Sequence, residues 1–193
     1  ASMQVYLISY FALCLVLTFA VLPWIVASVT PITYWQTIQM SKASLVTAFA
    51  TGNIFIVLPV IVEECKQVMK SHNTGGEDTD TLIEILVPIA FTFPNIGKLT
   101  VMLFVLFAGW FAGKPISPEA LPALAFSGLL ALFGDVYVAI PFMLDLVRLP
   151  SDLFQFFVMS GFLTGKFSSM VAVMNLFALT LIAISLFLGK LRY

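Results

Sequence analysis

The longest apolar stretch of the chain lies at its beginning. Residues 3–29 are almost entirely apolar, and the first charged side chain in the sequence is Lys42. A helix needs roughly 20 apolar residues to cross a bilayer, so this stretch is long enough for one complete crossing. It is too long for a secretory signal and lacks the basic start of one. We therefore expect a membrane-spanning helix over residues 3–29.

The composition of the whole chain supports a membrane environment. Of the 193 residues, 61% are hydrophobic and only 10% are charged, whereas soluble domains average about 25% charged residues. A net charge of −1 excludes a basic nucleic-acid module, so we expect the lipid bilayer and no nucleic acid as a partner. The sequence offers no Ser/His/Asp set, metal-ligand cluster or phosphate loop, which predicts a protein that is not an enzyme and carries no cofactor.

Beyond residue 40 the apolar pieces are shorter than a complete span. The run 43–62 is interrupted by Gly52-Asn53 and Pro59. Half-length apolar pieces interrupted by Gly, Pro or one charge are typical of re-entrant or broken helices. The other such runs are 85–97 and 99–113, divided by Lys98; 120–134 and 136–144, divided by Asp135; and 153–165 and 167–189, divided by Lys166.

Two blocks of sequence recur in the same order. Residues 52–66 match residues 134–148 as Gly-[Asn/Asp], [Ile/Val]-[Phe/Tyr]-[Ile/Val] and [Leu/Ile]-Pro, followed by an acid and a base. Residues 97–103 match residues 165–171 around Gly-Lys. The polar loop 71–80 is present only in the first copy. Self-similarity of this kind predicts an internal duplication.

The duplication predicts the fold class. A hairpin returns to the side it entered while a spanning segment crosses, so the second copy must enter from the opposite face, as in many secondary transporters. We expect an all-α integral membrane protein formed by one transport-core domain over residues 1–193. It would comprise one full span followed by two inverted repeats, each a re-entrant hairpin plus a broken transmembrane helix. The expected ranges are 3–29 for the span, 40–70 and 119–150 for the hairpins, and 82–113 and 152–190 for the broken spans.

The basic residues predict the orientation, because cytoplasmic loops carry an excess of Lys and Arg. Lys42, Lys66, Lys70, Lys190 and Arg192 fall on one side of this topology, and Lys114 and Arg148 on the other. The first hairpin and the C-terminus are then cytoplasmic, in a multi-pass protein of the cell (plasma or inner) membrane. Glu63, Glu64, Lys66 and Lys70 are expected to form a solvated face at the membrane interface.

Three short motifs carry a family resemblance. Ala48-Phe-Ala-Thr51 followed by Leu58-Pro-Val60 is similar to a first hairpin that reads Ala-Phe-Ser-Thr, a serine-rich tip and Leu-Pro-Val. Pro94-Asn-Ile-Gly-Lys98 occupies the place of an Asn-Met-Asp-Gly-Thr break, and Phe167–Val173 lies where the last helix carries its ligands. With this layout the chain resembles the C-terminal transport core of the dicarboxylate/amino acid:cation symporters, the glutamate-transporter family.

The resemblance implies a secondary carrier with elevator-like movement, coupled to sodium and assembled as a homotrimer through N-terminal scaffold helices. That scaffold half is missing from these 193 residues. The sequence departs from the family where ligands are bound: Ile96 and Lys98 stand in place of Asp and Thr at the break. In the last helix, Gly165 and Leu176 align with the acidic positions, and Ser168 and Ala172 with Arg and Asn. The usual sodium ligands are therefore absent from this alignment, which predicts transport without sodium coupling.

The predicted site lies at the hairpin tips and the breaks. A lysine near the bilayer centre costs about 2.5–3.5 kcal/mol on insertion scales, so Lys98 and Lys166 should face a cavity or a partner, or else snorkel to the interface. Asp135 is expected to pair with either lysine, or to act as a helix cap or solvated loop acid. Asn53 and Asn95 suit both capping and ligand contact. The predicted substrate-binding residues are Gly52, Asn53, Asn95, Gly97, Lys98, Asp135, Lys166, Ser168 and Ser169.

Two functions remain open at this point. The first is the core of a secondary active transporter for a small organic anion, either a dicarboxylate or an amino acid. The second is a descendant that no longer transports and acts as a membrane receptor, sensor or structural module. Lysines within apolar segments favour the first function, and the replaced ligands favour the second.

Overall fold

The computed structural model describes residues 2–131 and 134–191, and every regular element in these residues is a helix. Three helical stretches are long and apolar enough to cross a membrane: Met3–Val29, Glu77–Phe111 and Ser151–Phe187. The all-helical prediction is confirmed.

The helices are α1 (Ser2–Val16), the π-helix η1 (Leu17–Val21), α2 (Leu22–Val29), α3 (Tyr34–Met40), α4 (Lys42–Thr51), α5 (Ile54–Ser71), α6 (Glu77–Thr92), α7 (Thr100–Phe111), α8 (Leu121–Ala131), α9 (Val136–Leu146) and α10 (Phe154–Phe187), with short 3₁₀ turns η2 (Ile96–Leu99), η3 (Pro118–Ala120) and η4 (Ser151–Leu153).

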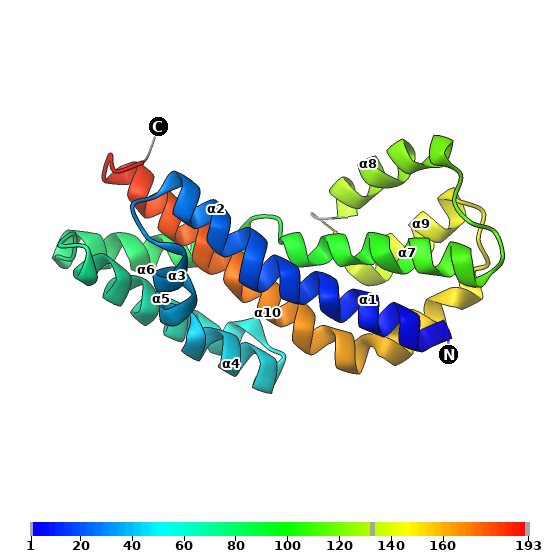
Figure 1. Cartoon of the computed structure of the whole chain (residues 1–193), viewed down its shortest axis with the longest axis horizontal. Coiled ribbons are helices and arrows are strands. Elements are labelled where there is room, and N and C mark those ends of the chain that lie inside the picture. Colours follow the sequence, from blue (N-terminus) through cyan, green and yellow to red (C-terminus); the bar gives the residue numbers. More distant parts are fainter. Residues whose placement is uncertain (1, 132–133, 192–193) are drawn as a thin grey trace.

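The helices are arranged along one long axis. α1, α2 and α10 run side by side in the same direction through the middle of the molecule, and α6–α7 runs the opposite way (Figure 1). The pair α4–α5 lies at one end and the pair α8–α9 at the other, and each pair turns near the centre (Figure 1). Leu132 and Phe133 of the predicted second hairpin, and Arg192 of the predicted cytoplasmic charges, lie outside the described residues.

A π-helical turn interrupts the first span. Pro23 has no backbone N–H, so the Phe19 carbonyl four residues earlier loses its helical donor. The π turn η1 precedes this proline, and the Tyr34 hydroxyl donates a hydrogen bond to the Phe19 carbonyl oxygen. Tyr34 begins α3, a helix that we did not expect from the sequence, and a capping box between Thr33 and Gln36 defines its start. The π turn η1 and α3 are therefore linked by one hydrogen bond.

The first hairpin turns at Gly52-Asn53. Gly52 has φ 64° and ends α4 in the left-handed conformation that glycine adopts without a steric penalty. The Asn53 side chain then accepts a hydrogen bond from the Phe55 backbone N–H and starts α5. α4 falls within the range 40–70 expected for the first hairpin, and α5 ends one residue beyond it.

The break between α6 and α7 follows from Pro94. The residue before a proline is driven towards extended conformations, and Phe93 has φ −73° and ψ 155°. α6 therefore ends at Thr92, and Asn95 begins the 3₁₀ turn η2 by accepting a hydrogen bond from the Gly97 N–H at 2.7 Å. The helix is interrupted within the range 82–113, at the Pro-Asn dipeptide.

The last helix differs from the expected broken span 152–190. α10 is continuous from Phe154 to Phe187 and passes through Gly165-Lys166 without interruption. A glycine in a helix interior costs only about 1 kcal/mol relative to alanine, whereas proline costs about 3 kcal/mol. The sequence of α10 contains glycines but no proline, and packing against the surrounding helices is sufficient to keep this segment helical.

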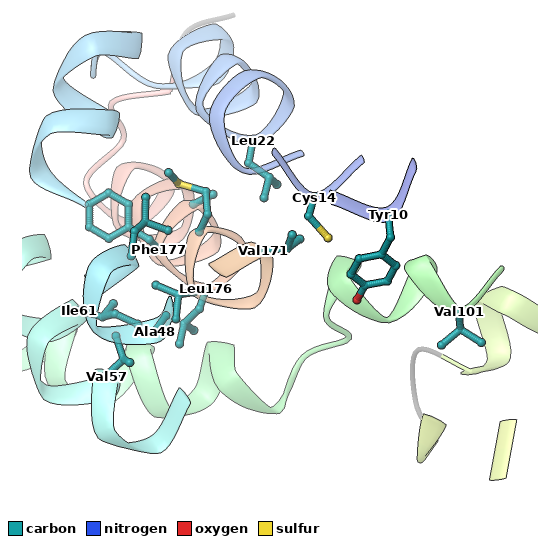
Figure 2. Close-up of a cluster of buried hydrophobic side chains, with 14 of the residues drawn as sticks. Tyr10, Cys14, Leu22, Ala48, Val57, Ile61, Val101, Val171, Leu176 and Phe177 are labelled. Atoms are coloured by element: carbon teal, nitrogen blue, oxygen red, sulfur yellow. The ribbon is translucent and has the colours of Figure 1, made fainter. Parts of the chain in front are cut away.

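The hydrophobic core is built around the second half of α10. Val171, Leu176 and Phe177 are buried between Leu22 of α2 on one side and residues of the first hairpin on the other (Figure 2). Burying apolar surface contributes roughly 25 cal/mol per Å². The hairpin residues in this cluster are Ala48, Val57 and Ile61. The core thus fixes the first hairpin against α10.

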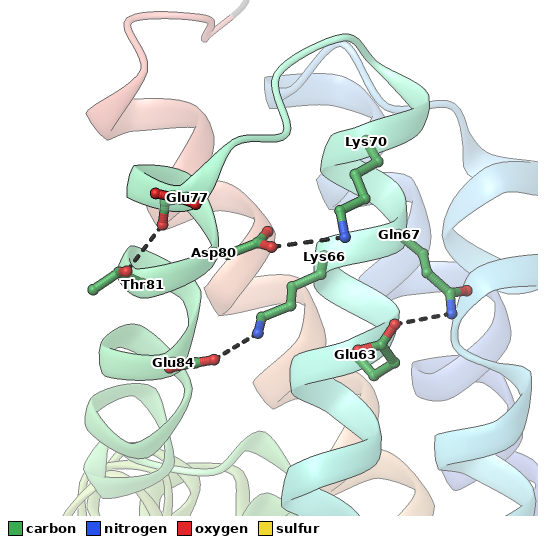
Figure 3. Close-up of polar contacts among 8 residues, drawn as sticks. All are labelled: Glu63, Lys66, Gln67, Lys70, Glu77, Asp80, Thr81 and Glu84. Atoms are coloured by element: carbon green, nitrogen blue, oxygen red, sulfur yellow. Dashed lines mark hydrogen bonds and ion pairs between the residues drawn. The ribbon is translucent and has the colours of Figure 1, made fainter.

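The polar end of α5 contains two ion pairs and one buried acid. Lys66 pairs with Glu84 at 2.6 Å and Lys70 with Asp80 at 3.6 Å, both across to α6 (Figure 3). Glu64 is only 6% exposed, so the prediction that it belongs to a solvated face is wrong. Its carboxylate accepts hydrogen bonds from the Ser44 backbone N–H, at 3.1 Å, and from the Ser44 hydroxyl. Glu64 is buried because it satisfies donors in the first turn of α4.

Candidate functional site

A cavity of about 690 Å³ lies where the first hairpin, the central break and α10 meet. Its walls come from residues far apart in the sequence, and the start of α9 closes one side. Its volume is within the range of small-molecule sites. Six of the nine predicted site residues line it, namely Gly52, Asn53, Asn95, Lys98, Ser168 and Ser169.

The tip of the first hairpin is bonded to α10. The Ser169 hydroxyl lies 3.1 Å from the Gly52 carbonyl oxygen and 2.9 Å from the Gly165 carbonyl oxygen of its own helix. Asn53 uses its side-chain oxygen to cap α5. Ser169 therefore positions the tip, and Asn53 directs the N-terminus of α5 to the cavity.

The central break packs closely on α10. A Cβ atom on Gly97 would lie 3.3 Å from the Ser168 carbonyl oxygen and 3.1 Å from the Asn95 side-chain oxygen. Gly97 is buried beside the cavity rather than lining it. On the other side of the break, the Thr100 hydroxyl lies 2.6 Å from the Gly97 carbonyl oxygen and 3.1 Å from the Tyr10 hydroxyl of α1. A side chain at position 97 would therefore be crowded by the break and by α10.

Lys98 connects the break to the second hairpin. Its ammonium donates a hydrogen bond of 3.0 Å to the Gly134 carbonyl oxygen, while the residue also lines the cavity. This bond joins Lys98 to the residue next to Asp135, the acid that was expected to pair with this lysine. The Asp135 carboxylate instead caps α9 by accepting from the Tyr137 N–H at 2.7 Å, so this acid takes the capping role that was one of its expected alternatives.

Lys166 lies beside the hairpin tip rather than in the wall of the cavity. Its ammonium lies 5.8 Å from the centre of the Phe49 ring and 5.6 Å from that of Phe162. Cations within about 6 Å of a ring centre are attracted to the ring face. The continuous helix α10 explains this placement, because no break at Gly165 turns the lysine inward.

Sequence reasoning missed Asn175. This side chain is 5% exposed and lines the cavity, and no other described residue forms a hydrogen bond with its amide. In a helix, residues four and seven positions apart share a face, so Ser168, Ala172 and Asn175 form one stripe. The signal was present in the sequence as a single amide in an otherwise apolar segment, seven residues after Ser168.

The cavity favours negative charge. Helix N-termini carry a partial positive charge and bind anions, and the start of α5 borders the cavity through Ile54. The start of α9 borders it through Val136, but the Asp135 carboxylate already caps that end. Lys98 adds a full positive charge to the wall. No Asp or Glu is among the described residues that line it. The arrangement suits a small anion, oriented by the amide of Asn175 and the hydroxyl of Ser168.

No protein-family model matches the chain, and no curated protein matches its sequence. The described residues define a class by their fold: an all-helical protein in which three helices are long and apolar enough to cross a membrane.

Proposed function

We propose that the chain is the core of a secondary active transporter that carries a small organic anion, a dicarboxylate or an amino acid, across the cell membrane. The observation that supports this function is the convergence of Lys98 and the N-terminus of α5 on a cavity of about 690 Å³. An anion within it would be held by a covalently attached ammonium and by backbone dipoles. This is the arrangement by which broken helices bind anionic substrates in transporters.

The proposed mechanism depends on two inverted repeats. The two hairpins share a helix cap at equivalent positions, Asn53 and Asp135, and each has a proline six residues later within its second helix. They lie at opposite ends of the long axis (Figure 1). Each tip glycine accepts a hydrogen bond from the other copy: Gly52 from Ser169 and Gly134 from Lys98. These reciprocal hydrogen bonds support a duplicated core in which the two hairpins open the cavity to the two sides of the membrane in turn.

In this proposal the chain belongs to the dicarboxylate/amino acid:cation symporters as a divergent member. The family motifs at Ala48–Thr51 and Pro94–Lys98 fall on the first hairpin and the central break. Lys98 would supply, as part of the protein, the positive charge that a bound sodium ion supplies in the family. Trimer formation and elevator-like movement are part of the same proposal.

A second function is an anion receptor that does not transport. The unbroken helix α10 favours it, because a continuous helix satisfies its own carbonyl groups and offers none to a passing ion. The cavity would then bind the anion and change the position of the second hairpin through Lys98. The cytoplasmic first hairpin would transmit the signal.

Uptake into proteoliposomes distinguishes the two functions. The purified chain is reconstituted and tested with labelled dicarboxylates and amino acids under sodium, potassium and proton gradients. We expect uptake that Lys98→Met abolishes and that Lys114→Met, which changes a lysine remote from the cavity, leaves intact. Binding without uptake would favour the receptor, and the absence of both would overturn the anion site.

A further inference from the structure

A second cavity opens on the apolar outer surface of the molecule. It has a volume of about 490 Å³ and lies between η1, α4 and α10, away from the candidate site. Its lining is apolar apart from Lys42, with Phe19, Val46 and Met170 among its walls. We call this cavity the α4 groove. Val46 is 69% exposed, so the groove is open to the surroundings.

The α4 groove has a charged end and an apolar end. Lys42 is the first residue of α4, and Ala50 lies near the helix end. At the Ala50 end, the Phe49 and Phe167 rings pack edge to face, 5.3 Å apart. Lys42 lies beside the polar end of α5, because Glu64 of α5 bonds to Ser44 in the same first turn of α4. Among the residues that the structure describes, Lys42 forms no ion pair.

The dimensions fit one leaflet of a bilayer. The segment from Lys42 to Ala50 rises about 12 Å at ~1.5 Å per residue. Half of the hydrocarbon core is about 15 Å thick. With Lys42 at the level of the headgroups, the groove would extend through most of one leaflet. An open apolar cavity in this position is filled from the surrounding lipid, and a lone ammonium at headgroup level attracts an anionic phosphate.

We propose that the α4 groove binds one anionic glycerophospholipid, with its phosphate on Lys42 and one acyl chain along α4 towards Phe49. The proposal requires only that the chain lies in a membrane and does not depend on transport. A lipid bound there would also affect the candidate site. The end of its acyl chain would contact Phe49, whose ring also lies under the Lys166 ammonium. A bound lipid would therefore stiffen the first hairpin behind Gly52.

Photo-crosslinking tests this site. The full chain is placed in nanodiscs of phosphatidylcholine and phosphatidylglycerol that contain a trace of phosphatidylglycerol with a diazirine on its acyl chain. We expect crosslinks to peptides of α4 and α10. Lys42→Gln should lower their yield by about five-fold, the effect of one basic residue near an anionic surface. Lys114→Gln is the matched control and should leave the yield unchanged.

A second pair of variants tests the groove itself. Val46→Trp fills the groove and should remove the crosslinks, whereas Ala125→Trp, on an exposed face of α8, should not. Helicity by circular dichroism establishes that both variants are folded, and the crosslink map of the parent remains informative if one is not. Equal labelling by a phosphatidylcholine probe would overturn the role of Lys42. Crosslinks between two copies of the chain at α4, with none to lipid, would overturn the lipid as occupant.

Discussion

The Lys98 ammonium donates a hydrogen bond of 3.0 Å to the Gly134 carbonyl oxygen, 36 residues further along the chain. This bond joins the central break to the start of the α9 turn, while the Ser169 hydroxyl makes the equivalent bond to Gly52 in the first hairpin. The first hairpin is thus held by a neutral hydroxyl and the second by a cation. In the proposed function, an anion in the cavity would compete with Gly134 for Lys98 and would have no comparable effect on Ser169.

The first prediction concerns this cation. Lys98→Met keeps most of the length of the side chain and removes the charge, so we expect the affinity for the anion to fall at least ten-fold. Hydrogen bonds to charged groups contribute about 1.5–3 kcal/mol, which corresponds to more than a factor of ten. Binding is measured by calorimetry with the detergent-solubilised chain. Lys114→Met should bind as the parent does, and an unchanged affinity in Lys98→Met would remove Lys98 from the site.

The second prediction tests the close packing of the break. Gly97→Ala places a Cβ atom 3.1 Å from the Asn95 side-chain oxygen and 3.3 Å from the Ser168 carbonyl oxygen. Overpacking of this kind costs about 1–3 kcal/mol, which SDS titration would detect as a lower free energy of unfolding.

The control for this variant is Gly161→Ala in α10. A Cβ atom there meets nothing within 4 Å, so the change should raise stability by up to about 1 kcal/mol through helix propensity. Equal effects of the two substitutions would show that the contact between the break and α10 is loose.

The third prediction uses the buried acid at the base of the first hairpin, outside the three candidate spans. Burial raises the pKa of the Glu64 carboxyl above its ordinary value of 4.5, and the hydrogen bonds from Ser44 oppose this shift. The folded chain then binds the proton more tightly than the unfolded chain. Stability is therefore greatest below pH 4.5 and falls as the pH rises through the folded pKa.

Glu64→Gln should remove this pH dependence. We expect its Tm to exceed that of the parent at pH 7 by about 2–4 °C, the shift that ~1 kcal/mol produces in a chain of this size, and the gain to disappear at pH 4. Glu63→Gln is the matched control, because Glu63 is exposed and its contact with Gln67 is 3.4 Å long. If the Tm of the parent instead rose relative to that of Glu64→Gln between pH 4 and pH 7, the ionised Glu64 carboxylate would stabilise the fold, contrary to this prediction.

Much of the local structure could be predicted from single residues. Pro94 and Asn95 predict a break because a proline restricts the backbone conformation of the residue before it and an asparagine caps the next helical turn. Both effects operate within three residues. The Gly-Asn turn of the first hairpin is of the same kind. A break was expected at Gly165-Lys166 because this dipeptide has the same sequence as Gly97-Lys98. Only Gly97-Lys98 comes shortly after a proline. The proline, rather than the Gly-Lys pair, determines where the helix ends.

The candidate site was less accessible to sequence reasoning. Asn53, Asn95 and Asp135 were each open to two roles, and the structure shows all three as helix caps. The choice depends on which backbone N–H lies nearby, and the turn geometry decides that. The position of Asn175 at the cavity and the burial of Glu64 depend on how distant helices pack, and nothing within a few residues of either one indicates what surrounds it.

The fourth prediction tests the membrane topology. A cysteine in the polar loop, Asn73→Cys, should react with an impermeant maleimide only from the cytoplasmic side, and Ser117→Cys only from outside. The native Cys14 and Cys65 are both buried, so the background should be low. The parent chain measures that background directly. Labelling of both introduced cysteines from one side would contradict the opposite orientation of the two hairpins.

The last prediction concerns the coupling ion. In the proposed site the positive charge belongs to Lys98, which is part of the protein and is present under every salt condition. The ammonium is held next to the cavity by its bond to Gly134. Anion binding should therefore change less than about two-fold when sodium is replaced by potassium at constant ionic strength, since screening depends on ionic strength and not on which of the two cations is present. Calorimetry with the same preparation in the two salts provides the measurement, and N-methylglucamine serves as the control for any small-cation effect. Binding that is strong in sodium and lost in potassium would show a cation site built from backbone carbonyl groups, and Lys98 would then act on the second hairpin alone.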